Sequence, residues 1–510
     1  MWYVHKTTRT TVLETQSLIQ ALHRQGFLNH THMKPYTVKD RKQKVELPLE
    51  AVIQQYGNTT FDARTFCNGS MIIGSTGSGK SSGPLDSITL GLFMAQPRMG
   101  GVITCAKQDD IDKIKERIVY AGREDDVIYV DATGDKRIAS LEMARQLTPV
   151  GSSQAVSILE AVKTFMQLNN GGNSANQDPF WESNIEKFII AASILLICAG
   201  EKVSFKNMLR ILNTMPHSDA DLDNADFLAK SYCIQLINKT EQNVIETTEN
   251  LDISLTYFLQ TIIRIESRTL SNIIATIHAA LFPATIGLFA NILDDVETNF
   301  STSMTFEGKI IVLNFPPSVY YSEGNRVLGM FYYLWMKDVM SRDLNVSNRC
   351  VFSVVDECQL IVNDYMIHFS SICRSQNCIV VYATQSLASI EARLNRMNGK
   401  VLVSQWMSNM GFKFMLCATD PSTIDFYKSV VGRDYEFRVG FNASLSAGNN
   451  SSNAHEDYRD IIPEKEFRLL ATGGEKNGYI VECILICAGT TFDDGETYMR
   501  VAFEQRKIAS

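Results

Sequence analysis

The sequence has no hydrophobic run long enough to cross a membrane. Its longest apolar stretch, Phe188 to Gly200, contains about 13 residues, whereas a transmembrane helix needs about 20. The first residues, MWYVHKTTRTTVLETQ, also lack the apolar core of about 7 to 15 residues that marks a secretory signal. We therefore expect a protein without a membrane span that stays in the cytoplasm, or that attaches there to the periphery of a membrane machine.

The cysteines and histidines lack the spacing of a structural site. The 11 cysteines include no CxxC pair, and neither they nor the 8 histidines follow the pattern of zinc ligands. An odd number of cysteines spread over 510 residues indicates free thiols in a reducing compartment. These patterns exclude a disulfide scaffold and a zinc finger.

The chain also lacks an excess of positive charge. Its 48 Lys and Arg residues are outnumbered by 56 Asp and Glu residues, which gives a formal net charge of −8. A site for a polyanion would therefore have to be local. Basic residues do gather between Lys34 and Lys44, in an N-terminal segment (1–67) that shows no strong helix or strand period after about Gly26. This basic segment is either a solvated connector or a nucleic-acid contact.

Seven short apolar runs indicate an α/β core. The chain is long enough for about two to four domains, and 45% of its residues are hydrophobic. Runs such as VITCA, IIVLNF and CIVVYAT are apolar on both faces, as is typical of central strands in a parallel sheet covered by helices. The seven runs are 71–73, 101–106, 127–131, 309–315, 350–355, 378–384 and 411–418.

One long segment without strand-like runs interrupts this core. Residues 151–268 contain several helical patterns, and we predict that they form an all-α domain inserted between the two parts of the core, 68–150 and 269–510. Near the C-terminus, Gly440 to Asp457 is rich in Ser, Asn and Gly and has no apolar period. We expect this stretch to be a mobile loop.

The motif GSTGSGKS matches the pattern GxxxxGK[ST] in full. It directly follows an apolar strand and precedes a helix-compatible segment (82–94), which is the context that a phosphate-binding loop requires. Its glycines let backbone N–H groups point at phosphates, and the helix adds its positive dipole end. Lys80 would contact the β- and γ-phosphates of ATP, and Ser81 would bind Mg²⁺. The predicted nucleotide-binding residues are Gly74, Ser75, Thr76, Gly77, Ser78, Gly79, Lys80 and Ser81.

Two adjacent carboxylates follow another predicted strand. Asp356 and Glu357 come directly after VFSVV, at the carboxyl end of the strand, where ligands bind in open α/β sheets. Asp356 would hold Mg²⁺ and Glu357 would act as the general base that polarises the attacking water. The alternative is that the two carboxylates only cap the next helix.

The next strand, CIVVYAT, ends in polar residues. Gln385 should emerge at the same edge of the sheet as Asp356, where it could sense the γ-phosphate or orient water. An ordinary strand end is the alternative. The short helix between the two strands carries Arg374, which by itself indicates only a surface arginine.

These motifs together resemble the FtsK/HerA group of RecA-like ATPases. Along the chain they read GSTGSGKS, then VVDECQ, then ATQS, with an arginine 11 residues before the glutamine of the last motif. Within that group the chain looks most like the TraG/TraD-type coupling proteins of conjugation and type IV secretion. The segments 178–196 (DPFWESNIEKFIIAASILL), 267–281 and 409–432 are also similar to that family.

The resemblance implies a RecA-like P-loop ATPase core that assembles into a homo-hexameric ring. Such a ring would move single- or double-stranded DNA, or a nucleoprotein, through its channel, with a relaxase or another secretion or packaging partner. The resemblance also implies roles for single residues. Ser81 and Asp356 would bind the metal, Glu357 would be the general base, Gln385 would sense the γ-phosphate and Arg374 would be an arginine finger. The sequence departs from the family pattern in two ways. Coupling proteins usually begin with transmembrane helices, for which this sequence has no sufficiently long apolar run, and of the family's frequent Asp-Pro-Lys motif only Lys107 is present.

Two functions of different classes follow from these observations. The first is an ATP-driven, ring-forming DNA translocase, which the set of motifs favours. The alternative is a nucleotide-controlled adaptor that recruits protein substrates to a secretion or assembly machine, which the negative net charge favours.

Overall fold

The computed structural model describes residues 49–170, 179–242, 250–394, 399–443 and 450–505. These residues form two compact units. Within the described ranges, the first unit comprises residues up to 97, 380–390 and those from 407 onward, and the second comprises 98–379 and 391–406. The predicted basic segment from Lys34 to Lys44 lies outside the described residues.

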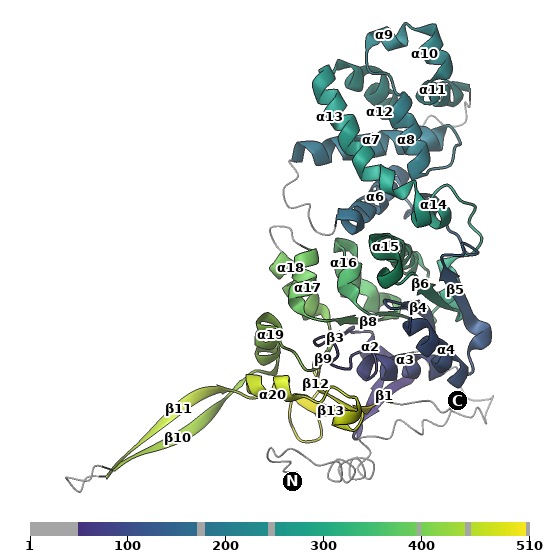
Figure 1. Cartoon of the computed structure of the whole chain (residues 1–510). Helices are drawn as coiled ribbons and strands as arrows, with labels where there is room; N and C mark the ends of the chain where they lie inside the picture. Colours follow the sequence, from purple (N-terminus) through teal and green to yellow (C-terminus); the bar gives the residue numbers. More distant parts are fainter. Residues whose placement is uncertain (1–48, 171–178, 243–249, 395–398, 444–449, 506–510) are drawn as a thin grey trace. The chain divides into compact units, whose positions relative to one another are not determined.

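Nine strands are ordered β13-β12-β9-β3-β8-β7-β4-β6-β5 in one sheet (Figure 1). Pairs among β3, β8 and β9 and among β4, β5, β6 and β7 are parallel, whereas β12 is antiparallel to β9 and β13 is antiparallel to β12. The predicted α/β fold with a mostly parallel sheet is confirmed. The strands are β3 (Ser70–Ile73), β4 (Gly100–Thr104), β5 (Val127–Asp131), β6 (Ile310–Asn314), β7 (Val351–Val355), β8 (Cys378–Thr384), β9 (Phe412–Met415), β12 (Ile480–Cys487) and β13 (Tyr498–Glu504).

Burial explains why five of the seven strands that the sequence predicts appear as apolar runs, whereas β5 has one buried residue. Every residue of β3, β4, β7, β8 and β9 is buried, and apart from Lys413 of β9 their side chains are apolar or small. Each of the seven predicted apolar runs overlaps one strand of the sheet, although β3 and β4 each begin one residue before their runs.

Between β5 and β6 the described residues form helices and no strand. Figure 1 shows most of these helices gathered at one end of the second unit, away from its strands. They are α5 (Ser140–Gln146), α6 (Gln154–Asn170), α7 (Pro179–Cys198), α8 (Phe205–Thr214), α9 (Asp219–Leu222), α10 (Ala225–Lys230), α11 (Tyr232–Gln242), α12 (Leu251–Thr256), α13 (Ser267–Leu281) and α14 (Gly287–Leu293). The limits of the predicted inserted domain, 151–268, stay a prediction, since the helices continue to Leu293.

The remaining helices accompany the strands. They are α2 (Ala63–Phe66), α3 (Pro84–Met94), α4 (Asp110–Tyr120), α15 (Pro317–Ser341), α16 (Asp364–Ile372), α17 (Leu387–Arg393), α18 (Gly399–Asn409), α19 (Pro421–Val431) and α20 (Glu464–Leu469). In the described part of the chain no single helix has the length and apolar character to cross a membrane. One bent pair, Ser267–Ala284 with Gly287–Leu293, meets those criteria.

A small hairpin precedes the sheet, in a segment where the sequence showed no strong period. Strands β1 (Val52–Tyr56) and β2 (Thr59–Asp62) pair antiparallel, so the N-terminal segment 1–67 is not devoid of regular structure. Tyr56 packs edge-on against Phe414 and Phe503, with ring centroids 6.4 and 5.9 Å away. The hairpin is thus held by aromatic contacts with the sheet rather than by a strong local pattern.

The predicted mobile loop at Gly440 to Asp457 is wrong for most of its length. Strands β10 (Arg433–Ala443) and β11 (Asn450–Asp460) pair antiparallel from Arg433–Asp460 to Ala443–Asn450, and Figure 1 shows this hairpin as a projecting arm. An antiparallel ladder is made by backbone groups, so it can form in a segment without an apolar period.

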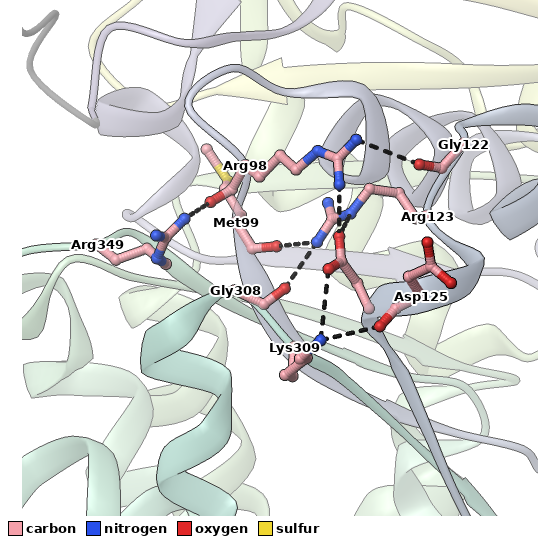
Figure 2. Close-up of polar contacts among 9 residues, drawn as sticks. Arg98, Met99, Gly122, Arg123, Asp125, Gly308, Lys309 and Arg349 are labelled. Atoms are coloured by element: carbon pink, nitrogen blue, oxygen red, sulfur yellow. Dashed lines mark hydrogen bonds and ion pairs between the residues drawn. The ribbon is translucent and has the colours of Figure 1, made fainter.

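A buried arginine ties together the chain at the start of β4 and β6 (Figure 2). Arg123 is 1% exposed and donates from Nη2 to the carbonyl oxygens of Met99 and Gly308, each at 2.8 Å. Its Nε donates to Asp126 Oδ2 at 2.6 Å. The guanidinium thereby satisfies two backbone acceptors and one carboxylate at the amino ends of the strands, opposite the edge where ligands of such sheets bind.

Candidate nucleotide-binding site

The phosphate loop lies between β3 and α3, as the sequence predicts. Gly77 and Gly79 have φ angles of 77° and 89°, a left-handed region that side-chain-bearing residues avoid. Pro84 begins α3, where its missing N–H costs no helical hydrogen bond. The backbone therefore has the curl that a phosphate-binding loop needs.

Lys80 is folded back over this loop. Its side chain is 5% exposed, and Nζ donates to the carbonyl oxygen of Gly74 at 2.8 Å and to that of Ser75 at 3.4 Å. These contacts hold the ammonium group inside the curl of the loop. The Ser78 hydroxyl is buried without a hydrogen-bond partner among the described residues, which fits a loop that an anionic group completes.

The ends of β8 and β9 fix the beginning of the loop. Gly74 N–H donates to the carbonyl oxygen of Thr384 at 3.3 Å, and Ser75 N–H donates to that of Cys417 at 2.9 Å. Thr76 Oγ1 donates to Gln385 Oε1 at 3.0 Å. The structure thus places Gln385 directly against the phosphate loop.

A second neighbour of the loop comes from residues that the sequence analysis missed. Ser75 Oγ lies 3.1 Å from Thr419 Oγ1, just past the end of β9, and accepts from the Thr419 N–H at 3.0 Å. One feature of the sequence could have indicated that Thr419 lies near the loop. It follows an apolar run whose end should reach the ligand edge of the sheet.

Strand β12 closes the loop from its other side. A Cβ atom added to Gly79 would overlap both Cγ atoms of Val481, and one added to Gly83 would lie 3.0 Å from Val481 Cγ1. Just beyond the loop, Ser82 Oγ accepts a hydrogen bond of 2.7 Å from Gln505 Nε2. Glycine is therefore required at position 79 for space as well as for its φ angle.

In the second unit, the acidic pair lies directly after β7. Asp356 and Glu357 are 8% and 5% exposed, and Glu357 has a left-handed φ of 50°. Its carboxylate accepts from Gln359 Nε2 at 2.7 Å and lies 3.7 Å from Lys107 Nζ, which follows β4. The side chain of Glu357 makes no cap hydrogen bond to the short helical turn that follows, whereas Asp356 Oδ1 accepts from the Glu357 N–H at 2.8 Å.

Cys358, the residue after the acidic pair, is a buried cysteine with a shifted thiol pKa. Burial raises the pKa of its thiol well above the usual range, and the negative charges of Glu357 and Asp356 raise it further. The thiol therefore stays protonated at neutral pH and is a packing group rather than a nucleophile.

Arg374 lies at the opposite end of β8 from Gln385. It is exposed and sits in a 3-10 turn (Cys373–Gln376) just past α16, before β8 begins at Cys378. The seven residues of β8 span about 23 Å at 3.3 Å per residue. Arg374 is therefore not brought together with Gln385 in one subunit.

Comparisons with known proteins show which family and which folds the chain resembles. A family model described as the TraM recognition site of TraD and TraG matches residues 350–472. The fold is similar to that of the bacterial conjugative coupling protein TrwBdeltaN70 in an unbound form, with 12% identity over 91% of this chain and 90% of that chain and a TM-score of 0.55. It is also similar to the plasmid coupling protein TrwB in complex with ADP and Mg²⁺, with 12% identity over 93% and 92% of the two chains and a TM-score of 0.58.

No curated protein sequence matches the chain. The predicted resemblance to TraG/TraD-type coupling proteins is nevertheless confirmed by the family match at residues 350–472, and the RecA-like fold is confirmed by the likeness to TrwB.

The contact of β12 with the loop gives a prediction on stability. Gly77→Ala should cost about 1–2 kcal/mol, since its φ is left-handed but no atom lies within 4 Å of the added Cβ. Gly79→Ala should cost about 1–3 kcal/mol more than Gly77→Ala, because its new methyl group would overlap Val481. The measurement is the free energy of unfolding in urea without nucleotide.

The control for this prediction is the double variant Gly79→Ala/Val481→Ala. Truncating Val481 opens space for the methyl group, so the double variant should be more stable than the sum of the two single changes by about 1 kcal/mol or more. Strict additivity of the two changes would contradict the close packing of Val481 on the loop.

Proposed function

We propose that this chain is an ATP-driven DNA translocase of the coupling-protein kind that works as a homo-hexameric ring. The observation that carries the proposal is the complete phosphate loop, to which Gln385 is hydrogen-bonded. The buried pair Asp356 and Glu357 follows β7, the strand next to β8 in the sheet order. The family match and the likeness to TrwB, a plasmid coupling protein seen with ADP and Mg²⁺, support the same class.

In this proposal the chain's own groups bind and orient the nucleotide. Lys80 would leave the carbonyl oxygens of its loop for the β- and γ-phosphates, and Gln385 would leave Thr76 to sense the γ-phosphate. Glu357, held by Gln359, would accept a proton from the attacking water.

Magnesium would neutralise charge on the phosphates, held by Ser81 and Asp356. Within the described residues no group of three or more His, Cys, Asp or Glu side chains could hold a metal. The Ser81 hydroxyl and the Asp356 carboxylate are ligands of the kind that Mg²⁺ takes, since it is usually bound by one or two carboxylates, waters and substrate phosphates instead of a protein cage.

The proposed partners are DNA and a protein. DNA would pass through the channel of the ring, and the protein partner would be a relaxase, another nucleoprotein or a TraM-like protein that binds within residues 350–472. The second candidate function, a nucleotide-controlled adaptor for protein substrates, is favoured by the net charge of −8.

Two substitutions test hydrolysis. Lys80→Ala should lose nucleotide binding, because it removes the charge that meets the phosphates. Glu357→Gln should still bind ATP but hydrolyse it about 100-fold more slowly or worse, since a carboxamide cannot act as a base. Steady-state ATPase rates and equilibrium nucleotide binding measure both effects. Normal turnover in Glu357→Gln would remove that residue from the mechanism.

The salt dependence of DNA binding separates the translocase from the adaptor. A motor that encloses DNA should release several counterions per complex, so its affinity should fall steeply with salt, whereas an adaptor should show almost no slope. Replacing Lys39, Arg41, Lys42 and Lys44 together should flatten the slope if the basic segment contacts phosphates. Absence of any salt-dependent binding to single- or double-stranded DNA would favour the adaptor.

Mixed assemblies test Arg374 as an arginine finger. Arg374→Ala and Lys80→Ala proteins should each be inactive alone, because one lacks the arginine offered to a neighbour and the other lacks the phosphate loop. Their mixture should regain part of the ATPase activity, since some interfaces pair an intact loop with an intact arginine, a group worth about 10³–10⁵ in rate. Arg374→Ala hydrolysing ATP at the normal rate by itself would refute the assignment.

A further inference from the structure

The turn before β12 lies at the same sheet edge as the phosphate loop. Strand β12 is antiparallel to β9, with Ile484 opposite Met415 and Cys487 opposite Phe412, so its first residues extend past the carboxyl end of β9. The end of β13 returns to the same place, since Glu504 pairs with Ile480. Tyr479 and Gln505, the residues just outside these two strands, are therefore brought to the ligand edge.

Hydrogen bonds fasten this turn to the residue that follows the loop. Gln505 accepts at Oε1 from the Gly474 N–H and donates from Nε2 to Ser82 Oγ, both at 2.7 Å. Its backbone N–H donates to the Tyr479 carbonyl oxygen at 2.8 Å, and the Tyr479 N–H donates to that of Gly474 at 2.8 Å. Tyr479 is thus connected to Ser82 through a single intervening side chain.

Tyr479 has an unfavourable backbone conformation that its own packing does not explain. Its φ is 61°, a left-handed value that glycine adopts freely and that a bulky residue adopts at a cost. Its side chain is 47% exposed, so burial in the core contributes little in return. Gly473, Gly474 and Gly478 hold the other left-handed positions of this turn, which makes the tyrosine the exception.

The order of the loop residues determines which part of a nucleotide would reach this turn. Lys80 and Ser81 address the β- and γ-phosphates and the metal, so the next residue, Ser82, lies toward the α-phosphate. The nucleoside is attached to the α-phosphate and would leave the loop past Ser82. Ser82 is the residue to which Gln505 fastens the turn.

We propose that Tyr479 stacks on the base of the nucleotide held by the phosphate loop, with Gln505 as the residue that positions it. The inference rests on the proposed nucleotide-binding function of the loop. An aromatic ring that contacts the face of a base does not read the hydrogen-bonding edge. The turn would therefore accept both adenine and guanine nucleotides.

Equilibrium binding of three ligands to the full chain tests the proposal: Mg·ATP, Mg·GTP and inorganic tripolyphosphate. Tyr479→Ala should weaken ATP and GTP by similar factors of about 5- to 150-fold, the range found when an aromatic ring is removed from a stacked base. Tripolyphosphate, which has no base, should bind as tightly as before. Tyr479→Phe keeps the ring and should retain nearly full affinity for both nucleotides.

Tyr479→Gly is the matched control for the backbone. Glycine suits the left-handed φ, so this variant should fold at least as well as Tyr479→Ala and yet bind ATP and GTP as weakly. Equal ATP affinity in Tyr479→Ala and Tyr479→Phe would overturn the stacking. An equal loss for tripolyphosphate would also overturn it, because the effect would then act through the loop.

The Lys80→Ala variant distinguishes this failure from a failure of the proposed function. If Lys80→Ala binds ATP normally, the phosphate loop is not the nucleotide site and the proposed function fails with the stacking. If Lys80→Ala loses ATP while the Tyr479 variants do not, the loop stands and only the stacking is wrong.

Discussion

The phosphate loop depends on a backbone that is fixed from outside before any ligand arrives. Its first two N–H groups donate to the ends of β8 and β9, and its last glycine lies against Val481 of β12. Left-handed φ angles at Gly77 and Gly79 let the chain turn within these limits. Because three strands hold the loop, its backbone is preorganised, and preorganisation lowers the cost of binding a ligand.

The burial of the central strands explains which parts of the site the sequence could predict. The loop and the acidic pair each follow a strand that is buried on both faces, and such strands appear in the sequence as short, wholly apolar runs. Once the strands are placed, parallel pairing brings polar residues such as Gln385 to one edge. Local pattern and strand direction were sufficient to predict the core of the fold, but the hydrogen bond between Thr76 and Gln385 is seen only in the structure.

The rest of the site could not be predicted because its contacts are between residues far apart in the chain. Ser75 and Thr419 are 344 residues apart, and Ser82 and Gln505 are 423 residues apart. Nothing in the local sequence indicates that β12 runs antiparallel to β9, although this reversal alone brings its first residues to the ligand edge. The β10–β11 hairpin was missed for a different reason. The sequence of β10 does alternate, with an apolar residue at every second position from Tyr435 to Phe441, but most of this alternation precedes Gly440 and β11 has none. Its ladder is made by backbone groups, which require no apolar pattern.

The length of β8 separates two of the predicted site residues, Gln385 and Arg374. β8 is buried throughout and ends beside the phosphate loop at Gln385, while Arg374 precedes its first residue. A strand of about 23 Å is several times longer than an arginine side chain can bridge, so Arg374 and Gln385 cannot serve the same phosphate within one subunit. If both take part in hydrolysis, the arginine must act on a nucleotide held by a second copy of the chain. In that case, the length of the strand alone would make hydrolysis depend on the contact of two copies.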